Sequence, residues 1–230
     1  MSVGKALVLA GGIAPYVDPW HPFGPTSELL AGIAREVGFE VEVAKDAVSR
    51  LADLTGVDLL IANVPAPDRE LDPSAVREAQ RGLDAFLAHP AGVLALHVSV
   101  TTLIGLDSWS SLMGARWSAG RTMHPPRGVS LVRTVGSNPI TAGLGEFTLD
   151  DELYSYLEFV GKSEPIVAHD YEGSSHPLIW VRELPHTRVV ADALGHGTES
   201  YDSVEHLTIL RRAMHWAGGI PAHPGTEEKE

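Results

Sequence analysis

Residues 92–99, Gly-Val-Leu-Ala-Leu-His-Val-Ser, form an apolar run with an imidazole near its end, and this run indicates the class of fold. An uninterrupted apolar run of this length is typical of a central strand in a parallel sheet, which is covered on both faces. The carboxyl ends of such strands face the ligand crevice of open α/β sheets. The sequence therefore predicts that His97 stands at that crevice. The alternative is a buried histidine whose ring nitrogens bind nearby backbone.

Strands and helices alternate before this run. Lys5–Ala10, Glu40–Ala44 and residues 57–64 have the composition of buried strands. One helix is predicted to begin after a cap at Thr26 or Ser27 and to end at Gly38, and a second follows Asp72-Pro73. This order predicts an α/β fold of the flavodoxin-like kind, a three-layer sandwich with a mostly parallel sheet and right-handed crossovers.

The chain after residue 105 has a different pattern. Gly128–Thr134 and residues 166–171, 178–182 and 188–193 have the pattern of short strands, with no long helices between them. We expect them to extend the sheet with antiparallel strands and to form loops over the crevice. A last helix is predicted over residues 203–217. The sequence thus predicts one α/β domain over residues 1–218 and a flexible tail over residues 219–230.

Composition excludes several classes of protein. The 230 residues are 44% hydrophobic, which is sufficient for a full core. Thirty acidic residues against seventeen basic ones leave a net charge of −13, which disfavours a nucleic-acid partner. The chain has no cysteine, so it has no disulfide, thiolate nucleophile or sulfur-ligated metal. No apolar run approaches membrane length, and the start of the chain has no leader pattern, so we expect a cytoplasmic protein with no membrane partner.

Two candidate site segments carry aromatic and imidazole side chains. Residues 15–23 follow the first strand, so Trp20 and His21 overhang the same sheet edge as His97 and suit stacking on a sugar ring. The alternative is a loop that packs into its own core. His124 follows a predicted short helix and a glycine, which would return it to the sheet edge. Alone, a histidine before two prolines is more often a turn residue.

One further segment carries three carboxylates, and another carries His196. In residues 149–154, three adjacent carboxylates lie between apolar residues, and Asp151 or Glu152 could orient an imidazole or act as a general base. The alternative is that Asp150 or Asp151 caps a helix. His196 lies between two glycines after an apolar strand, so the backbone can turn sharply there and expose the ring.

Local motifs do not decide whether the protein binds a metal ion or another cofactor. His97, His124, His196 and Glu152 would form a divalent-metal site if they converged, but no H-E-x-x-H spacing supports one. Ser99 lies near His97, yet residues 97–101 lack the G-x-S-x-G elbow of a serine hydrolase. The two glycines after the first strand are only a fragment of a dinucleotide-binding fingerprint.

These segments, taken in order, resemble the trehalose-utilisation (ThuA-like) family, which has the class I glutamine amidotransferase-like fold. Asn138 stands where the family usually has histidine before Pro-Ile-Thr, and only Gly92 remains of the glycines before the His97 strand, which is typical of a divergent member. The resemblance rests on His21-Pro22-Phe23, Leu94-Ala95-Leu96-His97, Trp109–Gly114, His124, Asn138–Leu144, Asp151-Glu152-Leu153-Tyr154, Pro177–Trp180 and Leu194-Gly195-His196.

The resemblance implies a role in carbohydrate utilisation, with trehalose or a related disaccharide or keto-sugar as the small-molecule partner. In the amidotransferase-like fold the strand that ends here carries the cysteine nucleophile, so His97 in its place excludes glutaminase chemistry. Exposed sheet edges are compatible with a homodimer.

The leading hypothesis is a sugar-processing enzyme in which His97 is the acid/base, oriented by Asp151 or Glu152. Alternatives are a non-catalytic sugar-binding or regulatory module and a metal-dependent hydrolase. The substrate-binding candidates are His21, Trp20, Ser99, His124, Trp180 and His196.

Overall fold

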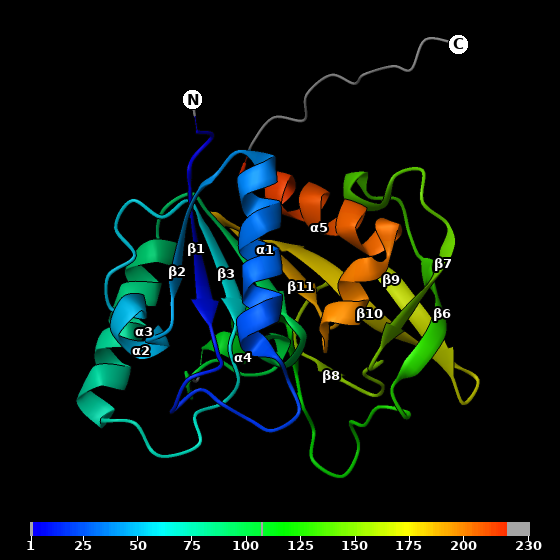
Figure 1. Ribbon diagram of the computed structural model, residues 1–230, viewed down its shortest axis with the longest axis horizontal. Coiled ribbons are helices and arrows are strands. Elements are labelled where there is room, and N and C mark those ends of the chain that lie inside the picture. Colours follow the sequence, from blue (N-terminus) through cyan, green and yellow to red (C-terminus); the bar gives the residue numbers. More distant parts are fainter. Residues whose placement is uncertain (1, 107, 220–230) are drawn as a thin grey trace.

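One nine-stranded sheet runs through the protein in the computed structural model, which describes residues 2–106 and 108–219 (Figure 1). The strand order is β2-β1-β3-β4-β11-β10-β9-β6-β7. Two short strands, β5 and β8, form a separate pair. The strands are β1 (Lys5–Ala10), β2 (Glu40–Ala44), β3 (Leu59–Asn63), β4 (Ala91–Leu96), β5 (Ala115–Arg116), β6 (Gly128–Thr134), β7 (Glu146–Asp151), β8 (Glu158–Phe159), β9 (Glu164–Tyr171), β10 (Ser174–Glu183) and β11 (Thr187–Asp192).

The sheet has a parallel half and an antiparallel half. β2, β1, β3, β4 and β11 are parallel neighbours, whereas β10, β9, β6 and β7 pair antiparallel. The predicted fold class is therefore confirmed. One C-terminal strand differs from the expectation, because β11 lies beside β4 and parallel to it. This position puts the residues after β11 at the same sheet edge as His97.

Helices cover both faces of the sheet and make the predicted three layers (Figure 1). α1 (Phe23–Val37) and α5 (Val204–Ala217) pack on one face, and α2 (Ala47–Leu51), α3 (Pro73–Leu87) and α4 (Trp109–Met113) pack on the other. Side chains of β1 alternate between the two cores: Ala6 and Val8 enter the first, Leu7 and Leu9 the second. This double burial explains why the parallel strands are uniformly apolar.

The start of the first helix differs from the prediction. α1 begins at Phe23, and Thr26 and Ser27 lie inside it rather than at its cap. Both side chains are buried, and their hydroxyl oxygens each accept a hydrogen bond of 2.9 Å from the amide of Asn63 at the end of β3. They attach the helix to the sheet. The predicted end is confirmed, because Gly38 follows the helix with φ +108°, a value that favours glycine.

The later elements agree with the prediction in most places. α5 begins after Ser203, whose hydroxyl accepts a hydrogen bond from the backbone of His206, and it ends at Ala217 as expected. Residues 220–230 of the predicted tail lie outside the described residues. Within the described part of the chain, no helix combines the length and the apolar character needed to cross a membrane.

Candidate functional site

His97 lies at the turn that ends β4, in a conformation that few side chains adopt. It opens a short 3-10 helix, His97–Val100, and its φ is +47°. This left-handed region is sparsely populated by residues other than glycine, and its use is concentrated at functional sites. The ring is buried, and its Nδ1 lies 3.0 Å from the carbonyl oxygen of Ala193, just after β11. The neighbouring strand therefore fixes the orientation of the imidazole.

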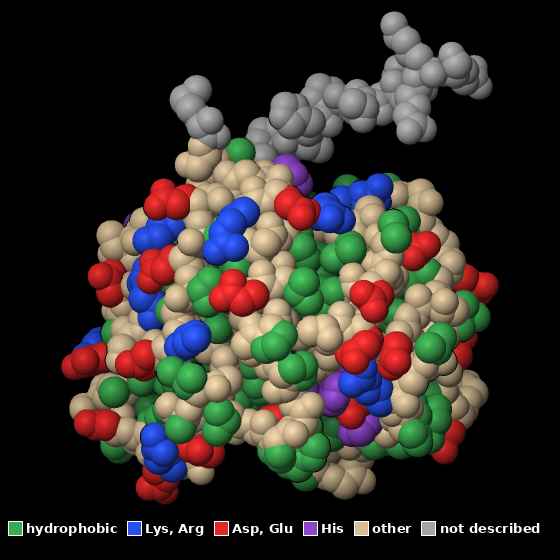
Figure 2. All heavy atoms as spheres, in the orientation of Figure 1, with side chains coloured by type: hydrophobic (Ala, Val, Ile, Leu, Met, Phe, Trp, Pro, Cys, Tyr) green, Lys and Arg blue, Asp and Glu red, His purple; other side chains and the backbone are tan. Residues whose placement is uncertain are grey.

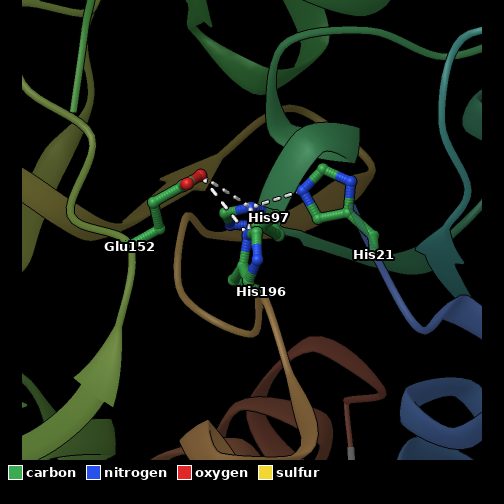
Figure 3. Close-up of side chains that lie close together, drawn as sticks. All are labelled: His21, His97, Glu152 and His196. Atoms are coloured by element: carbon green, nitrogen blue, oxygen red, sulfur yellow. Dashed lines mark hydrogen bonds and ion pairs between the residues drawn. The ribbon is translucent and has the colours of Figure 1, made fainter. Parts of the chain in front are cut away.

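Three side chains from different parts of the chain meet at His97 (Figure 3). His21 comes from the loop after β1, Glu152 follows β7 directly, and His196 lies in the loop after β11. Nε2 of His97 lies 3.1 Å from Nε2 of His21 and 3.3 Å from Nδ1 of His196. Oε2 of Glu152 lies 3.6 Å from Nε2 of His97 and 3.4 Å from Nδ1 of His196. We call these four residues the His–Glu cluster.

Asp18 holds His21 in place, and the sequence reasoning did not single it out. Oδ2 of Asp18 lies 2.6 Å from Nδ1 of His21, and its other oxygen accepts hydrogen bonds from the backbone N–H groups of Trp20 and His21. Burial and the neighbouring His97 lower the pKa of His21, and Asp18 opposes this shift without cancelling it. An acid three residues before a histidine in a proline-bounded loop was the available signal.

Asp151 supports the cluster from beneath and does not enter it. Its buried carboxylate accepts hydrogen bonds from the backbone N–H of Gly195 at 2.7 Å, from that of His196 at 3.2 Å and from the Ser200 hydroxyl at 2.5 Å. Gly195 has φ +101°, so the turn before His196 requires glycine. Asp151 therefore shapes this turn, and it has no contact with His97. The alternative role as a helix cap is also wrong, because Asp151 ends β7.

Glu152 connects the cluster to His124. Its Oε1 lies 3.2 Å from Nδ1 of His124, whereas Oε2 is the oxygen near His97 and His196. Burial alone would raise the pKa of Glu152, but the close imidazoles of His196 and His97 outweigh it and hold the pKa well below its usual range. Glu152 is therefore a carboxylate at neutral pH, with one oxygen for the cluster and one for His124.

Tyr154 is a further group that the sequence reasoning missed. Its hydroxyl lies 3.2 Å from Nε2 of His97, and its side chain is 4% exposed. Burial, reinforced by the nearby charge of Glu152, raises the pKa of Tyr154 well above its usual range, so the phenol keeps its proton. Its place two residues after Glu152, in a segment already under consideration, was the available signal.

A cavity of about 890 Å³ opens beside the cluster, within the size range of small-molecule sites. Trp20, 72% exposed, and the exposed Trp117 supply aromatic wall, and His124 is a polar lining group. His97 does not line it. Figure 2 shows histidine side chains at the surface in the lower half of this face, beside acidic and basic side chains. In Figure 1 this is the end of the molecule toward which β1 runs.

Two predicted substrate-binding residues lie in the core and away from the cavity. Trp180 is fully buried, and its indole N–H donates a 2.7 Å hydrogen bond to the carbonyl oxygen of Met113. Ser99 is also fully buried, and its hydroxyl is bonded to both backbone groups of Val64 at 2.9 Å. Trp180 thus packs the sheet against α4, and Ser99 attaches the turn after β4 to the end of β3. Neither side chain lines the cavity.

Comparison with known structures gives the same fold at low sequence identity. A ThuA-like protein from Parabacteroides merdae has a TM-score of 0.73 at 16% identity, with 94% of this chain and 90% of that chain covered. A ThuA-like protein from Bacteroides uniformis has a TM-score of 0.72 at 13% identity, with 94% and 91% covered. A β-galactosidase from Rahnella has a TM-score of 0.63 at 14% identity, with 96% of this chain but 32% of that chain covered.

Sequence comparison identifies the family. No curated protein matches the chain. The family model described as trehalose utilisation matches residues 20–217, a span that includes the whole His–Glu cluster, Tyr154 and His124. Because this match covers most of the 230 residues, the chain belongs to the ThuA family.

Proposed function

We propose that the protein is an enzyme that binds a carbohydrate in the cavity and exchanges protons with it through His124 and Glu152. The observation that carries this proposal is the close His124–Glu152 pair, with Nδ1 and Oε1 3.2 Å apart, in a cavity with tryptophan walls. The description of the family supports the class of substrate, with trehalose, a related disaccharide or a keto-sugar as the first compounds to test. A cytoplasmic location and a homodimer stay predictions from the sequence.

The walls of the cavity suit a sugar. A pyranose ring has an apolar face of C–H groups and a rim of hydroxyls. Trp20 and Trp117 present aromatic surface to the cavity, where such a face can pack. Asp18 and Glu152 offer carboxylate oxygens in the same cavity, and these accept hydrogen bonds from hydroxyls. A few polar groups on a mainly apolar wall are typical of selective small-molecule sites.

The tautomer of His124 makes it the proton acceptor. Its Nδ1 lies 3.2 Å from Oε1 of Glu152 and 3.0 Å from the carbonyl oxygen of Pro125, so the hydrogen-bond pattern assigns the proton to Nδ1. Nε2 then keeps a lone pair, and it has no hydrogen-bond partner within residues 2–106 and 108–219. It can take a proton from a sugar hydroxyl or from a carbon beside a sugar carbonyl, and Glu152 stabilises the imidazolium that results.

His97 has a different place from the one that the sequence favoured. Its side chain is 1% exposed and lies behind the cavity wall, where its two ring nitrogens face protein groups. We therefore propose His124, rather than His97, as the group that exchanges a proton with the substrate.

Ligand screening with two variants tests the proposal. Disaccharides and keto-sugars are screened for turnover and for an increase in the melting temperature of the protein. We expect His124→Ala to keep the sugar-induced increase and lose turnover, and Trp20→Ala to weaken sugar binding. His89→Ala, at an exposed histidine outside the cavity, is the matched control. Binding without turnover would favour the alternative function, a non-catalytic carbohydrate-binding module on a fold that lacks its nucleophile. If no sugar binds, both the enzyme and the binding module are refuted.

A further inference from the structure

We propose that His21, His97, His196 and Glu152 bind one divalent transition-metal ion, and that zinc fits this site best. Sequence reasoning had considered His97, His124 and His196 with Glu152. The structure puts His21 in the place of His124, and the ligand atoms of the four residues all lie within 4.8 Å of one another. The protons and lone pairs of these groups define the site, which therefore does not depend on any carbohydrate in the cavity.

The tautomer of His97 follows from the contact of its ring with Ala193. Its Nδ1 lies 3.0 Å from the carbonyl oxygen of Ala193, which can only accept a hydrogen bond. Nδ1 therefore carries the ring proton, and Nε2 of the neutral ring has a lone pair. That lone pair is directed at His21, His196, Glu152 and Tyr154.

His21 has the same arrangement. Its Nδ1 lies 2.6 Å from Oδ2 of Asp18, so this nitrogen donates to a carboxylate and Nε2 has the lone pair. An imidazole that donates one N–H to a carboxylate or carbonyl and presents its other nitrogen is the usual form of a metal-ligating histidine. Asp18 and Ala193 therefore supply the outer partners that histidine ligands have in known metal sites.

These two lone pairs face each other across 3.1 Å, the distance between Nε2 of His97 and Nε2 of His21. Two acceptors at this distance repel unless a positive charge lies between them. The Tyr154 hydroxyl can donate its single proton to Nε2 of His97, and the lone pair of His21 is then still unmatched. Glu152 adds an acceptor to the same space and no donor. A bound cation satisfies all of these acceptors together.

Four of the six separations between the ligand atoms lie near those of tetrahedral coordination, and the other two lie within 4.8 Å. Ligand atoms about 2.0–2.2 Å from a tetrahedral zinc ion lie about 3.3–3.6 Å from each other. The separations from Nε2 of His97 are 3.1 Å to His21, 3.3 Å to His196 and 3.6 Å to Glu152, and His196 and Glu152 lie 3.4 Å apart. Three imidazole nitrogens and one carboxylate oxygen favour zinc, nickel or cobalt over magnesium or calcium, which prefer oxygen ligands.

The chemistry of such an ion fits the position of the site. His21, Glu152 and His196 line the cavity, so an ion bound by them lies at its wall and can polarise a sugar oxygen. Glu152 can bind the ion through Oε2 while Oε1 keeps its contact with His124. The ion and the proposed proton acceptor would thus be connected by a single carboxylate.

Metal titration of the full-length protein tests the site with no sugar present. The protein is treated with a chelator and titrated with zinc chloride in a calorimeter, and we expect one ion per chain with a dissociation constant below about 1 μM. Magnesium chloride is expected to show no binding at the same concentrations. Failure to bind zinc stoichiometrically, or equal affinity for magnesium, would overturn the metal site and leave the carbohydrate proposal standing.

Variants separate ligands from their surroundings. His21→Ala and Glu152→Gln are expected to weaken zinc binding by about 100-fold or more, and Asp18→Asn by about 10–100-fold through the orientation of His21. His89→Ala should bind zinc like the wild type. Circular dichroism of each metal-free variant shows whether it is folded, and His97 is left unchanged because its ring is buried. Wild-type affinity in folded His21→Ala and Glu152→Gln would overturn the proposed ligands.

Discussion

Asp151→Asn is expected to destabilise the protein strongly although it changes few atoms. Oδ2 of Asp151 accepts hydrogen bonds from Gly195 N–H and the Ser200 hydroxyl, and Oδ1 accepts them from the N–H groups of Glu152 and His196. All of these partners are donors, and the carboxylate is 1% exposed. In asparagine one oxygen becomes an NH2 group, which then faces two donors.

The expected loss follows from those two bonds. A hydrogen bond to a charged group contributes about 1.5–3 kcal/mol, and a buried donor that loses its acceptor has no water to replace it. The Ser200 hydroxyl can rotate and accept from the new NH2 group, so part of the loss is recovered if the NH2 group takes the place of Oδ2. We therefore expect the free energy of unfolding to fall by about 2–4 kcal/mol. His196 would also lose its fixed position, since the turn before it depends on Asp151.

Urea denaturation at neutral pH measures the effect, with Asp150→Asn as the matched control on the same strand. Asp150 is 39% exposed and pairs with Arg127 at 3.3 Å, and an exposed pair contributes at most about 1 kcal/mol. A loss below about 1 kcal/mol for Asp151→Asn, or equal losses for the two variants, would refute the supporting role of Asp151.

Three further predictions concern stability. Burial lowers the pKa of His206, but the charge of Asp192 outweighs it and raises the pKa above 6.5. The stabilising effect of this pair is therefore complete at pH values below 6.5 and is lost as the pH rises through the raised pKa. The difference in the free energy of unfolding between wild type and His206→Gln, measured by urea denaturation, should shrink toward alkaline pH, and a constant difference would contradict this. Gly195→Ala should lower the free energy of unfolding by about 1–3 kcal/mol, because φ +101° strains any other residue, and an unchanged urea midpoint would count against that reasoning. Trp180→Phe should lower the free energy of unfolding by about 1–2 kcal/mol through the lost indole hydrogen bond and leave zinc binding unchanged. Altered zinc affinity at unchanged stability would show that Trp180 belongs to the site.

The sequence predicts the central fold well where burial dominates. The bounds expected for Lys5–Ala10, Glu40–Ala44 and Gly128–Thr134 agree with β1, β2 and β6. No residue range was predicted for α2, because a helix of five residues is too short to show a helical period. The parallel pairing of β11 with β4 was missed for another reason: strand order depends on contacts between distant segments, which a local pattern does not contain.

Part of the site could be predicted from strand ends alone. His21 and His97 follow the predicted parallel strands β1 and β4, whose carboxyl ends share one sheet edge. His196 reaches this edge because β11 is parallel to β4, which the sequence did not predict. Which imidazole nitrogen faces the cluster could not be predicted, because the tautomers depend on Asp18 and on the Ala193 carbonyl. Our proposal gives the proton exchange to His124 instead of His97 for a related reason: exposure and hydrogen-bond partners come from packing.

The different roles of Asp151 and Glu152 could have been predicted by treating residues 146–151 as a strand. Side chains of a strand alternate between its faces, so Phe147, Leu149 and Asp151 share the buried face of β7. A carboxylate on a buried face has to be hydrogen-bonded, because an unpaired buried charge costs several kcal/mol. The pattern Phe147-x-Leu149-x-Asp151 therefore indicates a supporting carboxylate. One residue later the alternation turns Glu152 to the other side, where it lines the cavity.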